Sequence, residues 1–308
     1  MLQETLELKS FLKDEKLKFG VKVGSIIRYK LSEFLNNRGF LEIPPVIISP
    51  FTDPLSYSTF DASIECYGNK YYLTKSMIFH KQIAIISFDK IFCFSPNVRL
   101  ENEEKAKSMR HLFEFTQLDI EVRNGEREEM IKFAEEMLIY ILKEVKKICK
   151  DEIEKFGREI KIPSIPFKRI SFEEAYSKYG KNYEEILSKE TKSPLWIFDF
   201  PKSMREFYYK ENEEREGWLV DMDLIYPEGF GEALSGGERE YEYEKIIKRI
   251  REVGSEKDYL YYLSIAKEGL YPSAGFGIGI ERLTRYICGL KDIGYTTPFP
   301  KIPGKYCI

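Results

Sequence analysis

The sequence predicts an α+β fold in which a mainly antiparallel sheet is flanked by helices. Residues 111–122 alternate between apolar and polar side chains, as a strand with one buried face does. In the middle of the chain, short strands outnumber the helices that parallel crossovers need, which argues against a doubly wound fold. We expect one domain, residues 1–308, with an N-terminal extension at 1–20 and a peripheral insertion at 150–215.

Apolar residues that recur at a helical period predict the helices, and several of these helices end at a glycine. The predicted helices are 22–38, a short helix capped by Ser76, 126–149, a helix with a capping box at Ser171 and Glu174, 240–253, 256–268, and a last helix after the glycine strand. Short β-rich runs predict strands at 70–74, 90–95, 111–122, 195–201, 218–226 and 230–235, followed by a glycine strand that begins at Gly275.

The composition is that of a globular enzyme without a metal framework or a membrane span. Apolar residues make up 43%, charged residues 32%, and the net charge is −3, so no overall attraction to nucleic acid is expected. Five cysteines form no C-x-x-C pair and only two histidines are present, which disfavours a zinc site or a disulfide framework. The N-terminus has no apolar signal region and no run is long enough to span a bilayer. We therefore expect a cytoplasmic protein.

The stretch GFGIGIER, Gly275 to Arg282, places glycine at every second position just before an acid and an arginine. Glycine weakens a strand, so this pattern suggests that a flat group approaches the backbone closely. The spacing is not that of the dinucleotide fingerprint. A cramped crossing between strands is the alternative interpretation.

The polar face of the strand at 111–122 carries an aromatic ring among acceptor groups: Phe115, Gln117, Asp119 and Glu121. Such a face suits a cleft that stacks a ring and reads polar groups, although a solvent-exposed amphipathic strand would look similar. Just upstream, Arg99 and Glu101 share a strand face, and Arg110 and His111 follow a charged loop. Arginine forks pair phosphate oxygens in a bidentate manner, so polyphosphate binding is one interpretation and a solvated charged hairpin is the other.

A third group of candidates follows at 223–239. Asp223, Glu232 and the hydroxyl of Ser235 are hard oxygen ligands of the kind that hold Mg²⁺ on phosphates. Arg239 follows a Ser-Gly-Gly turn that permits close backbone approach. A paired acid and arginine is, on its own, more often a plain salt bridge.

Together these segments resemble the three signature motifs of class II aminoacyl-tRNA synthetases. GFGIGIER resembles motif 3, which implies that Gly277 and Gly279 underlie adenine and that Arg282 meets the terminal phosphates of ATP. Residues 24–45 resemble motif 1 and its dimer interface, with a proline about one residue early. The resemblance implies a class II core with a mainly antiparallel six-stranded sheet, a homodimer, and no anticodon-binding domain, because only about 20 residues precede motif 1.

VRLE and RHLFEF resemble motif 2. The resemblance implies that Arg99 holds the α-phosphate, Glu101 the adenine amino edge and Phe115 the adenine face. Arg110 and His111 would then contact the outer phosphates.

Within that class the C-terminal run is similar to asparaginyl-tRNA synthetase, whereas LTKSMIFHKQ resembles aspartyl-tRNA synthetase. The second resemblance implies that Lys81 and Arg239 bind a carboxylate of aspartate. The other implied substrate-binding residues are Ser76 and Gln117. Ile78 stands where the family has a glutamine that reads the substrate's amino group.

This combination is similar to the archaeal asparagine synthetase-related proteins, truncated relatives of these synthetases. It implies an ATP-dependent, AMP-forming aspartate–ammonia ligase of asparagine biosynthesis, which acts through a β-aspartyl adenylate. Arg99 and Arg282 are its expected catalytic residues, ATP and Mg²⁺ its cosubstrate and metal, aspartate and ammonia its substrates, and tRNA an unlikely partner. Two alternatives remain: a tRNA ligase of the asparaginyl or aspartyl type without an anticodon domain, and a non-catalytic nucleotide-binding paralogue.

Overall fold

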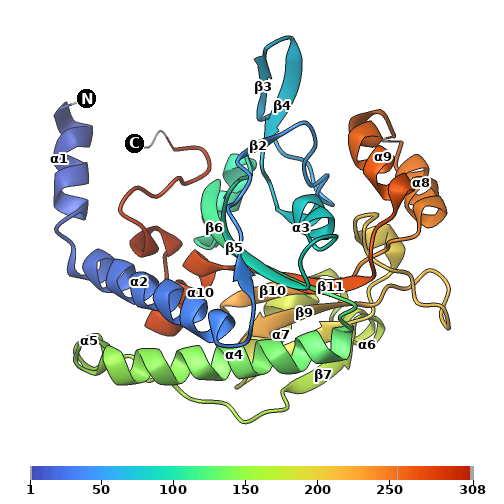
Figure 1. The fold of residues 1–308 in the computed structure, drawn as a ribbon. Helices are drawn as coiled ribbons and strands as arrows, with labels where there is room; N and C mark the ends of the chain where they lie inside the picture. Colours follow the sequence, from blue (N-terminus) through green and yellow to red (C-terminus); the bar gives the residue numbers. More distant parts are fainter. Residues whose placement is uncertain (1, 255, 306–308) are drawn as a thin grey trace.

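The computed structural model describes residues 2–254 and 256–305, and within them the main sheet has eight strands. In their order across the sheet they are β1 (Leu41–Glu42), β5 (Lys90–Val98), β6 (Glu114–Arg123), β11 (Ser273–Gly279), β10 (Gly231–Glu238), β9 (Asp221–Tyr226), β8 (Leu195–Phe198) and β7 (Lys168–Ser171) (Figure 1). From β5 to β8 every neighbouring pair is antiparallel, and β1 and β7 pair in parallel at the two edges. The predicted fold class is therefore confirmed, with two short edge strands added to the six antiparallel ones.

A second, smaller sheet projects away from the main one (Figure 1). Its strands, in spatial order, are β2 (Ile48–Ser49), β4 (Asn69–Leu73) and β3 (Ser63–Cys66). The chain between β2 and β3 passes over the main sheet and delivers Tyr57 to the site described below.

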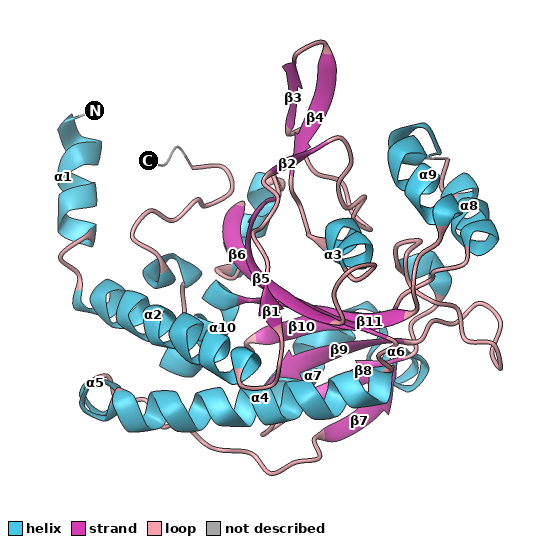
Figure 2. Cartoon of the chain, in the orientation of Figure 1, coloured by secondary structure: helices cyan, strands magenta, loops and turns pink. Residues whose placement is uncertain are grey.

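One face of the main sheet is covered by α2 (Glu15–Asn36), α4 (Arg127–Ile148) and α10 (Ile280–Cys288) (Figure 2). Apolar side chains from these helices and from β6 and β11 form one buried cluster. Two further helices adjoin this layer in the chain, α1 (Leu2–Phe11) before α2 and α5 (Lys150–Lys155) after α4. Helix α2 begins earlier than predicted because the Asp14 side chain accepts a hydrogen bond from the Lys16 amide, 2.7 Å away, and so caps it.

The opposite face carries two separate groups of helices. At one end, α3 (Ile78–Ala84), α8 (Tyr243–Glu252) and α9 (Leu260–Glu268) share a second apolar cluster. At the other, α6 (Phe172–Tyr179) and α7 (Tyr183–Glu190), from the predicted peripheral insertion, pack on β8 and β9. Short 3₁₀ helices lie in the connections at Glu103–Ser108, Gly180–Asn182, Lys202–Met204, Glu256–Tyr259 and Ile293–Thr296. The middle of this face, formed by β6, β11 and β10, carries the candidate site.

Strand register explains the alternation of the glycines. Gly275, Gly277 and Gly279 lie opposite Glu121, Asp119 and Gln117. A Cβ at Gly277 would lie 1.8 Å from Nε2 of Gln117, and one at Gly275 would lie 2.3 Å from Oε2 of Glu121. The bare positions at Gly275 and Gly277 therefore let the polar side chains of β6 lie across β11, as the alternative interpretation, a cramped crossing between strands, expected.

Within the described residues no helix combines the length and the apolar character that crossing a bilayer requires.

Candidate active site

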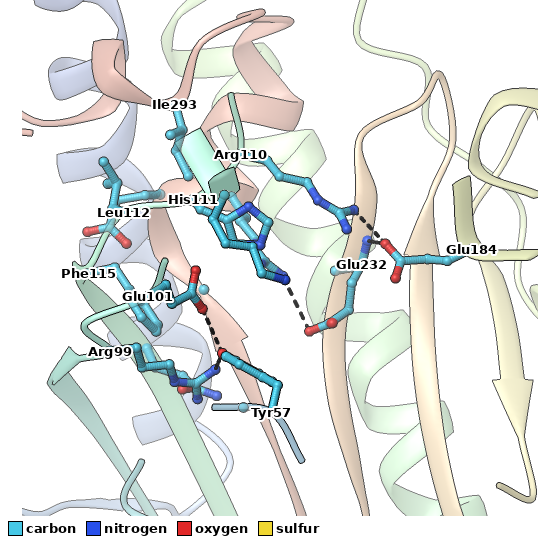
Figure 3. A pocket seen from close by; sticks show the side chains of 17 residues that line it. Tyr57, Arg99, Glu101, Arg110, His111, Leu112, Phe115, Glu184, Glu232 and Ile293 are labelled. Atoms are coloured by element: carbon cyan, nitrogen blue, oxygen red, sulfur yellow. Dashed lines mark hydrogen bonds and ion pairs between the residues drawn. The ribbon is translucent and has the colours of Figure 1, made fainter. Parts of the chain in front are cut away.

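Two adjoining cavities open on the central strands. The first cavity is lined by Tyr57, Arg99, Glu101, Lys105, Arg110, His111, Leu112, Phe115, Gln117, Glu184, Glu232, Ala233, Gly277, Gly279, Glu281, Arg282 and Ile293 (Figure 3). The second cavity is lined by Asp53, Leu55, Ser56, Tyr57, Ser76, Ile78, Lys81, Arg99, Gln117, Asp119, Arg205, Glu206, Tyr208, Tyr209, Glu232, Ser235, Arg239 and Gly277. Both lists contain Tyr57, Arg99, Gln117, Glu232 and Gly277. Every predicted site residue except Asp223 lines at least one cavity.

A ring, a guanidinium and a carboxylate form one wall of the first cavity. The guanidinium carbon of Arg99 lies 5.2 Å from the ring centre of Phe115, and its Nε donates to the carbonyl of Lys75 at 3.0 Å. The Tyr57 hydroxyl donates to Glu101 at 2.7 Å. This wall offers a flat apolar face, an acceptor and a fixed cation beside one another, which suits a purine joined to a phosphate.

Cations form the other wall. Arg282 lies 3.4 Å from Glu232, and Arg110 lies 2.5 Å from Glu184. Burial, together with Arg282 and Arg110, lowers the pKa of His111 to about 2, so its ring is neutral at neutral pH. Burial alone would raise the pKa of Glu232, but the surrounding arginines lower it below its ordinary value, so this carboxylate is ionised.

The second cavity is built over a buried ionic network. The ammonium of Lys81 lies 3.0 Å from Asp119 and 3.4 Å from Glu121, and the guanidinium of Arg239 lies 3.1 Å from Glu121. These four residues are 3% or less exposed. Two cations thus face two carboxylates, and the network as a whole is neutral. Atom Oδ2 of Asp119 is buried and has no hydrogen-bond partner among the described residues.

The predicted metal ligands do not form a ready-made metal site. Asp223 is bound to Arg205 at 2.7 Å, and burial raises its pKa to about 7 despite that arginine. The hydroxyl of Ser235 lies 3.4 Å from that of Tyr209. Across the part of the chain that the structure describes, no three acidic, histidine or cysteine side chains group as metal ligands. Of the predicted set, Glu232 fits Mg²⁺ best, because it is ionised and lines both cavities.

Several lining residues escaped the sequence analysis. Tyr57 and Arg205 come from irregular segments, and Glu184 comes from the insertion, so no periodic pattern marks them. Glu281 directly precedes Arg282, and this adjacency in the sequence could have marked it as a site residue. Its carboxylate accepts the amide hydrogen of Thr116 at 3.0 Å, beside Phe115.

The sequence matches the family of class II tRNA synthetases (D, K and N) over residues 8–303. The chain belongs to this family. Asparagine–tRNA ligases from Thermococcus gammatolerans and Pyrococcus abyssi are each 30% identical to it, over 92% of this chain and 70% of theirs. The structure of asparaginyl-tRNA synthetase from Pyrococcus horikoshii complexed with asparaginyl-adenylate matches with a TM-score of 0.88 and 28% identity. That match covers 96% of this chain and 71% of the other.

These relatives correct two predictions. Since tRNA ligases match over more than nine tenths of the chain, the prediction of an ammonia-dependent asparagine synthetase, with its β-aspartyl adenylate, is wrong. The expectation that tRNA is an unlikely partner is wrong for the same reason. Membership of a truncated paralogous group is not confirmed.

In this class II synthetase core, charge balance and packing explain the presence of the residues that led to the two incorrect predictions. Lys81 and Arg239 are already neutralised by buried carboxylates, so they do not demand an anionic substrate. Ile78 is 3% exposed, belongs to the apolar cluster around α3 and also lines the second cavity, so its side chain contributes to packing as well as to the cavity wall.

Proposed function

We propose that this chain is an AMP-forming ligase of the asparaginyl-tRNA synthetase type, which activates asparagine with ATP and transfers it to tRNA. The observation that carries the proposal is the position of Arg99. Its side chain lines both cavities, one suited to a nucleotide and one to a small polar molecule. A cation at such a junction stabilises negative charge that develops when a carboxylate attacks an α-phosphate.

In the first cavity, Phe115 would stack on adenine and Glu101 would accept from its amino group. Glu101 already accepts a hydrogen bond from Tyr57, so it is oriented as an acceptor. Arg110, His111 and Arg282 would bind the outer phosphates and orient the leaving pyrophosphate. Gly277 and Gly279 line the same cavity. The Gln117 side chain already lies over Gly277, whereas Gly279 leaves room beside the base. When bound, Mg²⁺ held by Glu232 would neutralise phosphate charge.

In the second cavity, the charge balance favours asparagine over aspartate. Lys81 and Arg239 are offset by Asp119 and Glu121, so a neutral amide side chain adds no unpaired charge to a buried site. The free acceptor atom Oδ2 of Asp119 suits the ammonium of an amino acid. Ser76 and Gln117 line the cavity. They would donate hydrogen bonds to the side-chain amide of asparagine and accept hydrogen bonds from it. No nucleophile on the protein is required, because the carboxylate attacks ATP directly.

Two assays test the proposal: ATP–pyrophosphate exchange with single amino acids, and charging of unfractionated tRNA with labelled asparagine or aspartate. We expect exchange driven by asparagine and formation of asparaginyl-tRNA. Exchange driven by aspartate alone would show that the cations dominate the second cavity and would contradict the choice of substrate. No exchange with either amino acid would contradict the function itself.

A further inference from the structure

A carboxylate from the peripheral insertion reaches into the first cavity. Glu184 lies on α7, far in sequence from the motif segments, yet its side chain lines the cavity beside Arg110 and Glu232 (Figure 3). Its atom Oε1 accepts two hydrogen bonds, one from Nη1 of Arg110 at 2.5 Å and one from the main-chain amide of Glu232 at 3.3 Å. One oxygen therefore joins a proposed phosphate-binding guanidinium to the strand that carries the proposed metal ligand.

The Arg110 guanidinium is held tightly against β10 by this contact. A Cβ built at Gly231 would lie 2.1 Å from Nη1 of Arg110 and 3.1 Å from Oε1 of Glu184, so the guanidinium occupies the space that glycine leaves. The side chains of Arg110 and Glu184 are 30% and 28% exposed, so both also face the open cavity. Arginine has five N–H donors, and this contact uses one, which leaves the others for phosphate oxygens.

Helix α7 is itself fixed to the sheet, as a positioning element must be. The hydroxyl of Ser188, one turn after Glu184, donates to the carbonyl of Tyr226 at 2.7 Å and accepts from the amide of Gly231 at 2.8 Å. The amide of Gly229 donates to the carbonyl of Ser188 at 2.9 Å. These bonds tie the helix to both strands of the β9–β10 hairpin.

We propose that Glu184 is a positioning residue for ATP, which fixes the Arg110 guanidinium relative to Glu232 so that both meet the outer phosphates together. The inference rests on the proposed function, because it takes ATP as the ligand of the first cavity. It assigns the insertion a part in nucleotide binding. Since the role lies in the reach of one oxygen atom, geometry matters more than charge at this position.

Three substitutions separate reach from charge. Glu184→Gln loses the charge but keeps an acceptor oxygen that serves both donors. Glu184→Asp keeps the charge but withdraws it by one methylene, and Glu184→Ala removes both. Glu185→Ala is the matched control, because this neighbour is 68% exposed at its side chain and pairs with Lys189 on the helix surface.

The measurements are calorimetric titration with ATP and Mg²⁺ and the kinetics of ATP–pyrophosphate exchange. For Glu184→Ala and Glu184→Asp we expect Kd and KM for ATP to rise about tenfold, the lower end for loss of one charged hydrogen bond. KM for asparagine should not change. Glu184→Gln should stay within about threefold of wild type, a free-energy difference below that of one ordinary hydrogen bond. Glu185→Ala should match wild type in every value.

The opposite order would overturn the inference. If Glu184→Asp matches wild type while Glu184→Gln does not, the carboxylate acts by its charge and not by its reach. If Glu184→Ala binds ATP more tightly than wild type, the carboxylate competes with phosphate for Arg110. If Glu184→Ala fails to fold, the comparison of the Asp and Gln variants still decides. Should wild type bind ATP but catalyse no exchange, the proposed function fails, and calorimetry alone still tests Glu184. If wild type binds no ATP, both proposals fail.

Discussion

Replacing Lys81 by methionine is expected to destabilise the fold, and not only the second cavity. The Lys81 ammonium donates to Asp119 at 3.0 Å and to the carbonyls of Ile120 and Phe276 at 3.3 and 3.4 Å. Those two residues face each other in the β6–β11 pair, so the ammonium joins the central strands. Its removal leaves Asp119 and Glu121 with one cation, Arg239, in a site that is 3% or less exposed.

The size of the effect follows from that burial. Removing one partner of a buried ion pair costs about 3–5 kcal/mol, because the remaining charge is left uncompensated. The matched control is Lys189→Met, which breaks an exposed pair with Glu185 and should cost about 0.5 kcal/mol or less. A double variant, Lys81→Met with Asp119→Asn, should regain at least about 1 kcal/mol, because one unpaired buried charge is gone.

The assay is guanidinium chloride unfolding at neutral pH, followed by the fluorescence of the two tryptophans. A loss in Lys81→Met no larger than in Lys189→Met would refute the reasoning. So would a double variant that is less stable than the single one. Either result would mean that the network relaxes or admits water when the lysine is removed.

Three further outcomes are expected. Arg99→Ala should lower kcat in ATP–pyrophosphate exchange about 10²–10³-fold, as loss of a charge-stabilising donor does, and a change below about threefold would exclude it from the reaction. Burial raises the pKa of Glu281 to about 7, so its stabilising contribution is complete below about pH 4.5 and is lost as pH rises through 7. Relative to Glu281→Gln, wild type should therefore lose about 1–3 kcal/mol of unfolding free energy between pH 5 and pH 8, and parallel pH curves would disprove this. We also predict a homodimer whose subunits contact each other through exposed apolar side chains such as Tyr29 and Leu41. A monomer at micromolar concentration in sedimentation equilibrium would contradict this prediction.

Periodicity was enough to predict the main elements. The strand at 111–122 and the helix at 126–149 lie where predicted, at Glu114–Arg123 and Arg127–Ile148, because each has one apolar face with a regular period. Helix α2 was predicted from residue 22, although it begins directly after its Asp14 cap. The polar residues in its first turns obscure the apolar period there. Its apolar stripe is buried within the chain, so this stripe is not available as the surface of a homodimer.

The site was predictable where its residues lie on adjacent strands. Arg99, Phe115, Gly277 and Arg282 come together because β5, β6 and β11 are neighbours and α10 follows β11 directly. Partners were not predictable. A sequence does not show that Lys81 faces two carboxylates or that Asp223 faces Arg205, because each pairing joins segments far apart in the chain.

The glycines of β11 also determine which positions of this strand can be substituted in directed evolution of this protein. At positions 275 and 277 a methyl group meets a carbonyl or an amide within 2.1 Å, so a mutant library should leave both unchanged. At position 279 the nearest atom to a new methyl group is Cβ of Arg282 at 3.7 Å, an ordinary contact, and φ is −71°. Alanine or serine therefore fits there without displacing the strand. A search for altered nucleotide preference has its most permissive starting point at the last glycine of the three.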